Sequence, residues 1–437
     1  MEHPSVSRRN RAPHLLYGTV VTTGLLLGVF GARTPSGVVL GDSIPYAFVL
    51  FVLVLLGIGM FHHHTLYVAL TGAVAITLYT GVFCPGRPPS ADAATLWEHF
   101  VHEGQHTLLN LGGLMLGFTL LADLFERSRV ADNLIRFLPK RRAHAAFALL
   151  ALVWFMSSFL DNIAAAMIGG VMALRVFRGD VSVAYLAAIV AASNAGGAWS
   201  VLGDTTTTMM WIEGVSPGTV FPCIVAATVA FLCFGIPGAR RQGRQRDALA
   251  TPEATQVPID WLRLLNVGLI LAGAITTNVM LDRPFIGVWA MLLLGSLWRA
   301  PTWSHLLPAL RGTVFLLALV WCASLMPVRA LPDPSWVTSL GLGFLSSVFD
   351  NIPLTKLALQ QGGYDWALLS FAVGFGGSMM WFGSSAGVSL AAVFPQLRHT
   401  GRYLYHGWPI AVAYVLAFLV MLLLLGWHPT EITRVHH

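Results

Sequence analysis

The chain has 437 residues, of which 56% are hydrophobic and 11% are charged, and its mean hydropathy is +0.69. An ordinary soluble domain carries roughly 25% charged residues, so this composition excludes a soluble globular protein and predicts an all-α polytopic membrane protein in a lipid bilayer. The net charge of +6 predicts no nucleic-acid partner, because Lys and Arg gather in the cytoplasmic loops of membrane proteins.

The first expected element is an apolar run over 15–32, which follows three arginines, Arg8, Arg9 and Arg11. No small-residue cleavage site follows this run, so we expect an uncleaved helix. The arginines place the N-terminus in the cytoplasm of a bacterial-type inner membrane, and residues 1–43 then form a cytoplasmic N-terminus and first helix. Further spans are expected near 44–61, 65–83 and 107–124.

The next apolar segment, 143–174, is expected to be a re-entrant hairpin. A single crossing would put Arg175 and Arg178 outside, whereas a hairpin keeps them and the basic cluster at 240–246 inside. Each arm would have about 15 residues and a length of roughly 22 Å, shorter than the hydrocarbon core of roughly 30 Å. Crossings over 182–213 and 219–237 complete a first repeat over 44–238.

A polar segment over 239–260 is expected to be a cytoplasmic linker between two repeats. The second repeat, 261–427, contains expected spans near 262–281, 284–298 and 312–327, a hairpin over 335–361, and crossings within 365–394 and 408–426. Residues 428–437 would form an external tail. The chain thus reads as about 11 transmembrane helices and two re-entrant hairpins in two inverted-topology repeats, a pattern typical of secondary transporters.

Two short motifs occur once in each repeat. SSxxDNI is found at 157–163 and again at 346–352, so that Asp161 and Asp350 lie deep in apolar hairpins, where an acid is costly unless it is functional. GGx5G follows at 196–203 and 376–383, where glycines break a helix and expose backbone groups. Close helix packing would also explain a single glycine pair, but two matching pairs favour a binding site.

The chemistry of these segments suits a hard cation. Asp161, Asp204 and Asp350 supply carboxylates, and a carboxylate that binds either H+ or Na+ performs exchange without a cofactor. The alternative is that each hairpin aspartate only caps the following helix. Lys356 also has two interpretations. In the first it lies at the site, paired with Asp161 or Asp204, where it stands in for a cation or attracts a carboxylate substrate. In the second its side chain reaches the outer vestibule near Gln360.

The ordered pattern DN, NAGGAWSxxGDTTTTMMW, DNIP and GFGGSxxxxGSSAG resembles the ion-transporter superfamily over 44–427. Within it the chain looks most like NhaD-type Na+/H+ antiporters and citrate-transporter-like permeases. This resemblance implies a homodimer, an elevator-like motion, and a site where the two hairpin tips meet the two broken helices. The chain departs from the antiporter pattern at 164–166, where alanines replace expected threonines, and at Lys356.

Together, motifs and resemblance predict a secondary transporter and no enzyme. Cation (Na+)/proton exchange is the leading hypothesis, and cation- or proton-coupled transport of a citrate-like or other anion is the alternative. The expected ion- or substrate-binding residues are Ser158, Asp161, Asn162, Asn194, Gly196, Gly197, Asp204, Thr205, Thr206, Ser347, Asp350, Asn351, Thr355, Lys356, Gly376, Gly377, Ser378, Ser384 and Ser385, with Na+ at Asp161, Asn162, Asp350 and Asn351.

A rival from another class is an intramembrane zinc protease, because residues 102–106 read HExxH. On a helix His102 and His106 would share one face, and Glu103 could activate a zinc-bound water. No persuasive third ligand follows, since the next candidate, Asp123, lies 17 residues beyond His106. This rival also leaves both repeated motifs unexplained, so no resident metal is expected.

Overall fold

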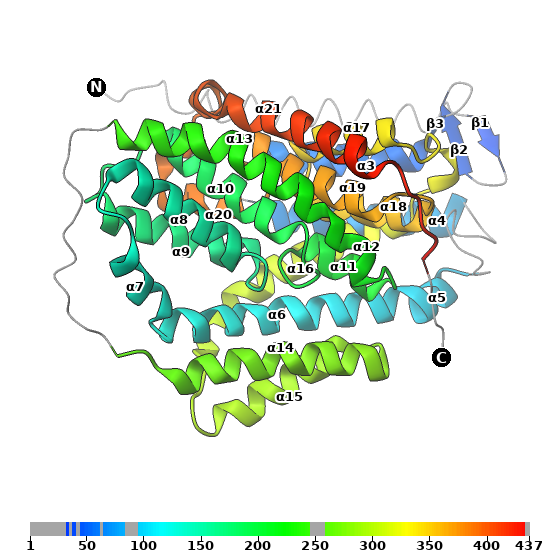
Figure 1. Ribbon diagram of the computed structural model, residues 1–437. Helices are drawn as coiled ribbons and strands as arrows, with labels where there is room; N and C mark the ends of the chain where they lie inside the picture. Colours follow the sequence, from blue (N-terminus) through cyan, green and yellow to red (C-terminus); the bar gives the residue numbers. More distant parts are fainter. Residues whose placement is uncertain are drawn as a thin grey trace, which may run out of the picture. The chain divides into compact units, whose positions relative to one another are not determined.

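The computed structural model describes residues 32–34, 37–40, 44–61, 64–83, 95–244 and 258–432 (Figure 1). The expected first helix over 15–32, most of the linker and the end of the tail lie almost wholly outside the described residues. The chain divides into two compact units. The first unit comprises Met1–Leu108, Arg311–Pro332 and Lys356–Gln361, and the second comprises Leu109–Leu310, Asp333–Thr355 and Gly362–His437.

Helices form nearly all of the described structure. Up to the linker they are α3 (Tyr46–Met60), α4 (Thr65–Phe83), α5 (Leu96–His99), the π-helical turn η1 (Phe100–Gly104), α6 (Gln105–Arg127), α7 (Val130–Leu134), η2 (Ile135–Phe137), α8 (Arg142–Met156), α9 (Asn162–Val176), α10 (Val183–Gly197), α11 (Thr205–Ile212), α12 (Pro217–Val220), η3 (Phe221–Cys223) and α13 (Ile224–Gly243). Three short antiparallel strands, β1 (Ala32–Thr34), β2 (Gly37–Leu40) and β3 (Ile44–Pro45), precede them and depart from the all-α prediction.

Beyond the linker the described residues are again helical. They are α14 (Trp261–Leu281), α15 (Pro284–Ser296), η4 (Trp303–His305), α16 (Leu306–Ser324), η5 (Val328–Ala330), α17 (Trp336–Ser346), α18 (Asn351–Gln361), α19 (Trp366–Ser370), the π-helical turn η6 (Phe371–Phe375), the 3-10 turn η7 (Gly377–Met379), α20 (Ser385–Val393), η8 (Pro395–Arg398) and α21 (Thr400–Leu425). Among the described residues, six helices are long and apolar enough to cross a membrane, and seven apolar helices are shorter. The chain is therefore a multi-pass membrane protein, while the total of about 11 crossings stays a prediction.

Both expected hairpins are interrupted where the sequence indicates. The first consists of α8 and α9, with 15 residues each, and the break between them is 157–161. The second consists of α17 and α18, with 11 residues each, and its break is 347–350. At 1.5 Å per residue the arms are roughly 22 Å and 17 Å long, so no arm alone reaches across a hydrocarbon core of roughly 30 Å.

The core of the second unit is built around α10. Every residue of this helix from Ala184 to Gly197 is buried. Helix α10 contacts α8, α9, α13 and α21, which flank it in Figure 1. A helix that is apolar on all sides can be buried on all sides, and the alanine-rich sequence of α10 allows close approach of its neighbours. Its C-terminal end therefore holds Asn194 at a defined position inside the unit.

The two repeats share local geometry at their breaks. The hydroxyl of Ser157 donates to the Ser193 carbonyl oxygen at 2.6 Å, and the equivalent Ser346 donates to the Val373 carbonyl oxygen at 2.6 Å. These contacts tie each hairpin break to the broken helix that follows it. They support the pairing of the motifs, whereas the inverted orientation of the repeats stays a prediction.

The linker begins later than expected. Helix α13 continues to Gly243, and Gln242 is fully buried. Its Oε1 accepts the Ser182 N–H at 3.0 Å and the Ser182 hydroxyl at 2.9 Å, and its Nε2 donates to the Asp180 carbonyl oxygen at 2.6 Å. The expected start of the linker at 239 is therefore wrong. The polar side chain of Gln242 is hydrogen-bonded to the loop before α10 and does not face solvent.

Replacing Gln242 by Ala is expected to lower the free energy of unfolding by about 1–3 kcal/mol, because buried donors and an acceptor around Ser182 lose their partner. Thermal unfolding of the detergent-solubilised protein checks this. The control is Arg240→Ala, an exposed position two residues earlier, for which a change within about 0.5 kcal/mol is expected. Equal effects of the two substitutions would contradict the role of Gln242.

Candidate ion-binding site

Asp204 is the centre of a buried hydrogen-bond network in the second unit. It lies between α10 and α11, in extended conformation, and is 1% exposed. Its Oδ1 accepts the Nδ2 of Asn162 at 3.0 Å, and its Oδ2 accepts the Nδ2 of Asn351 at 3.2 Å. Asn162 opens the second arm of the first hairpin and Asn351 opens the second arm of the other. One carboxylate thus joins both hairpin tips.

Asn194 extends this network to the second broken helix. Its Oδ1 accepts the Nδ2 of Asn162 at 3.1 Å. Its Nδ2 donates to the hydroxyl oxygens of Ser378 at 2.9 Å and Ser384 at 3.0 Å. Ser384 in turn accepts the Gly387 N–H at 3.3 Å and so caps α20. Four chain breaks that are far apart in the sequence therefore meet through amide and hydroxyl groups.

Two further carboxylates lie close to Asp204. Asp161 occupies the cap position before α9 and lies within electrostatic range of Asp204. The charge of Asp350 also interacts with that of Asp204. The Oδ1 of Asp350 accepts a hydrogen bond from the Ile352 N–H at 3.0 Å, as the capping interpretation expects, and the Oδ2 of Asp350 accepts one from the Ser385 hydroxyl at 3.4 Å. Mutually repelling acids in a buried site favour a bound cation or proton between them.

The glycines permit the close approach of backbone segments at both breaks. A Cβ on Gly196 would overlap the backbone carbonyl of Trp154 in α8, and a Cβ on Gly376 would overlap the backbone of Gly343 in α17. Gly197 and Gly377 each approach the carbonyl oxygen of the third glycine of the motif, six residues later. The glycines thus have a packing role, and that packing is what brings the broken helices to the tips.

The threonines expected near the site have different local roles. Thr205 donates to the Oδ1 of Asp204 at 3.3 Å, and Thr206 is fully buried beside it. Thr355 donates to the Asn351 carbonyl oxygen at 2.9 Å, within α18. The next two threonines were not predicted: Thr207 and Thr208 donate to the carbonyl oxygens of Ser200 and Val201, at 2.7 and 2.9 Å. The run of four consecutive threonines, Thr205 to Thr208, was the feature of the sequence that could have indicated these two residues.

In each Ser-Ser pair of the SSxxDNI motif, the first serine and not the second contacts the broken helix. Ser158 and Ser347 were expected to supply oxygens to the site, but their hydroxyls donate into their own helices, to Phe155 at 2.7 Å and Phe344 at 2.6 Å. The preceding serines, Ser157 and Ser346, make the contacts to the broken helices. Both serines belong to the repeated motif, and only the helical rotation of about 100° per residue distinguishes them.

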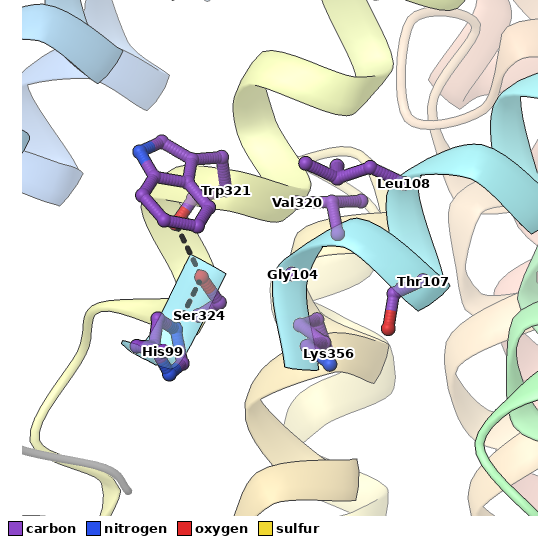
Figure 2. Close-up of a pocket in the computed structure, with 8 residues that line it drawn as sticks. All are labelled: His99, Gly104, Thr107, Leu108, Val320, Trp321, Ser324 and Lys356. Carbon is purple, nitrogen blue, oxygen red and sulfur yellow. Dashed lines mark hydrogen bonds between the residues drawn. The ribbon is translucent and has the colours of Figure 1, made fainter. Parts of the chain in front are cut away.

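Lys356 lies in the first unit and is 2% exposed. The interpretation in which it reaches an aqueous vestibule is therefore wrong. It lines a small cavity of about 10 Å³. The other lining residues are drawn in Figure 2: His99, Gly104, Thr107, Leu108, Val320, Trp321 and Ser324. His99 and Ser324 are hydrogen-bonded at 3.3 Å, and the Nε2 of Gln360 donates to the Ser324 carbonyl oxygen at 2.8 Å. A role of Lys356 at the ion site stays a prediction.

The HExxH segment runs from η1 into α6. The side chains of His102 and Glu103 lie outside the described residues. Asp123, the candidate for a third ligand, has other contacts: its Oδ2 accepts the Thr302 N–H at 2.8 Å, and its Oδ1 lies 3.5 Å from the His305 Nδ1. Asp123 thus anchors the loop before α16.

Several known proteins are similar to this chain in sequence. No protein-family model matches the chain. The Na+/H+ antiporter NhaD of Alkalimonas amylolytica is 28% identical over 370 residues, covering 69% of this chain and 74% of that protein. NhaD of Halomonas elongata is 25% identical over 446 residues, covering 82% and 89%. Sodium/proton antiporter 1 of Arabidopsis thaliana is 24% identical over 384 residues, covering 75% of this chain and 65% of the plant protein.

The chain resembles the NhaD-type Na+/H+ antiporters. The resemblance predicted from the DN and glycine motifs is thereby confirmed. The NhaD-type relatives are named as transporters and not as enzymes, which also confirms the prediction of a non-enzyme. They align over most of the chain, so the likeness extends beyond the repeated motifs.

Proposed function

We propose that the protein exchanges Na+ for H+ across a membrane. The observation that carries this proposal is the carboxylate of Asp204, which is hydrogen-bonded to Asn162 and Asn351 from the two hairpin tips. Asp161 and Asp350 add two charges within electrostatic range of it. The names of the NhaD-type relatives support the same ions. No cofactor other than the coupling ions is needed for this exchange.

The geometry suggests how one site takes either ion. Asn162 and Asn351 present N–H groups to Asp204, which suits a carboxylate without a metal ion. When a cation enters, a half-turn of the Asn351 amide about its terminal bond directs its oxygen to the cation, while Asn162 keeps its bond to Asn194. A proton on the carboxylate removes the charge that the cation requires. Na+ and H+ therefore compete for the same group, and exchange follows if only a loaded site changes sides.

The change of sides is proposed to be an elevator-like motion of the segments that hold the site. The two short, interrupted hairpins and the two broken helices support this, because such elements surround midplane sites in transporters with inverted repeats. We further propose a homodimer in a bacterial-type inner membrane with the N-terminus inside. These assignments rest on the resemblance and on the distribution of Lys and Arg.

Carboxylate transport remains the competing proposal, but its main support was Lys356. Lys356 lines a cavity with His99 and Ser324, whereas the tip network is built from carboxylate, amide and hydroxyl groups. Within that network the central group is a carboxylate, which repels an anionic substrate. Cation exchange therefore has the better support.

Purified protein in liposomes that contain a pH-sensitive dye tests the proposal. We expect an imposed pH gradient to be dissipated by added Na+, with Li+ as a second test cation, and not by choline chloride or by choline citrate. Protein-free liposomes and protein with K+ are the controls. Proton movement driven by citrate but not by Na+ would contradict cation exchange and favour the anion alternative.

A further inference from the structure

Tyr403 contacts the second broken helix from outside the ion network. It lies in α21, is fully buried, and its phenol donates to the carbonyl oxygen of Ser378 at 2.8 Å. Ser378 is part of η7, a 3-10 turn of three residues at the helix break. Carbonyl groups at such a break lack the regular intrahelical partners, so a side-chain donor decides how the turn is held.

The same Ser378 is the point at which the network reaches η7. Its hydroxyl accepts the Nδ2 of Asn194 at 2.9 Å, and Asn194 accepts the amide of Asn162. Tyr403 is thus hydrogen-bonded to the backbone of one residue whose side chain belongs to the network. A shift of that backbone moves the hydroxyl and with it Asn194, which accepts from Asn162, the residue that donates to Asp204.

We propose that Tyr403 is a positioning residue that sets the apparent affinity for Na+ by fixing Ser378. This inference rests on the proposed cation exchange. Tyr403 acts through the Ser378 carbonyl, so its loss leaves every group of the network in place but holds them less firmly. The affinity for the cation therefore falls more than the maximal rate of exchange.

The chain contains a matched control for the phenol. Tyr185 in α10 is also fully buried, and its hydroxyl donates to the Ala146 carbonyl oxygen at 2.7 Å. Ala146 lies inside the regular helix α8, away from its break at 157–161. Removing either hydroxyl deletes one buried hydrogen bond to a backbone carbonyl, but the carbonyl bonded by Tyr403 lies at a helix break and the one bonded by Tyr185 does not.

The experiment compares Tyr403→Phe and Tyr185→Phe in proteoliposomes over a series of Na+ concentrations. For Tyr403→Phe we expect the half-saturating Na+ concentration to rise about 3- to 10-fold, the change that loss of one hydrogen bond produces. The maximal rate should stay within about twofold of the parent, and Tyr185→Phe should leave both parameters unchanged. Size-exclusion profiles and thermal unfolding establish that each variant is folded.

Several results would overturn the role of Tyr403. One is an unchanged half-saturating concentration in Tyr403→Phe, and another is an equal shift in Tyr185→Phe. Failure of Tyr403→Phe to fold while Tyr185→Phe folds would also overturn it, since the phenol would then stabilise the fold rather than tune the site. Absence of Na+-driven exchange in the parent protein would instead reject the proposed function.

Discussion

Replacing Asp204 by Asn is expected to abolish Na+-driven proton movement. The substitution preserves the volume of the side chain but removes the charge that both ions require. A unit charge about 4 Å from a cation, at an effective dielectric constant of about 20, contributes about 4 kcal/mol. Loss of that interaction lowers the exchange rate at fixed Na+ by about 100- to 1000-fold. The measurement is dissipation of a pH gradient in proteoliposomes upon addition of Na+.

The new amide group also places a hydrogen-bond donor opposite another donor. One oxygen of Asp204 becomes an N–H donor that faces the amide of Asn162 or Asn351, so one hairpin tip loses its acceptor. We expect a destabilisation of about 1–3 kcal/mol, with the fold retained. Asp180→Asn is the control, because Asp180 pairs with Arg142 at 3.0 Å outside the site, and this variant should exchange normally. Comparable rates in Asp204→Asn and the parent would exclude Asp204 as an ion ligand.

Replacing Gly196 by Ala is expected to prevent normal assembly of the first break. The added Cβ would overlap the backbone carbonyl of Trp154, and backbone cannot move aside as the end of a flexible side chain can. Overpacking of a buried position typically costs 1–3 kcal/mol, and we expect about 3 kcal/mol here. Gly376→Ala should behave alike, because its Cβ meets the backbone of Gly343. Thermal unfolding and the yield of monodisperse protein are the measurements.

Gly341→Ala is the matched control for these two variants. Gly341 lies in α17, and a Cβ added there meets no atom within 4 Å. Alanine favours a helix over glycine by about 0.5–1 kcal/mol, so this variant should be as stable as the parent or slightly more stable. If Gly196→Ala were equally well tolerated, the close approach of α8 and the broken helix would not be needed, and the glycine motif would require another explanation.

The serine pairs and the aspartates show how far the local sequence leads. Repetition of SSxxDNI correctly located both hairpin breaks, because Ser, Asp and Asn side chains bind the backbone groups that helix ends leave unpaired. It did not distinguish Ser157 from Ser158. Neighbouring helical residues point about 100° apart, and which of the two faces the broken helix depends on how the helices pack. Asp204 followed the first glycine break and was expected near the site. Its bonds to both tips depend on residues 42 positions before it and 147 positions after it.

By itself, the sequence determined that the chain is a membrane protein and that it carries two copies of each motif, because composition and motif spacing are properties of the linear chain. It also located the breaks, since Gly, Asp-Asn and charge act within a few residues. Only the tertiary structure decided that Asp204 joins the tips, that Gln242 is buried in α13, and that Lys356 lies in the first unit. These outcomes depend on which distant segments pack together. A buried polar side chain forms hydrogen bonds with the groups that this packing places beside it.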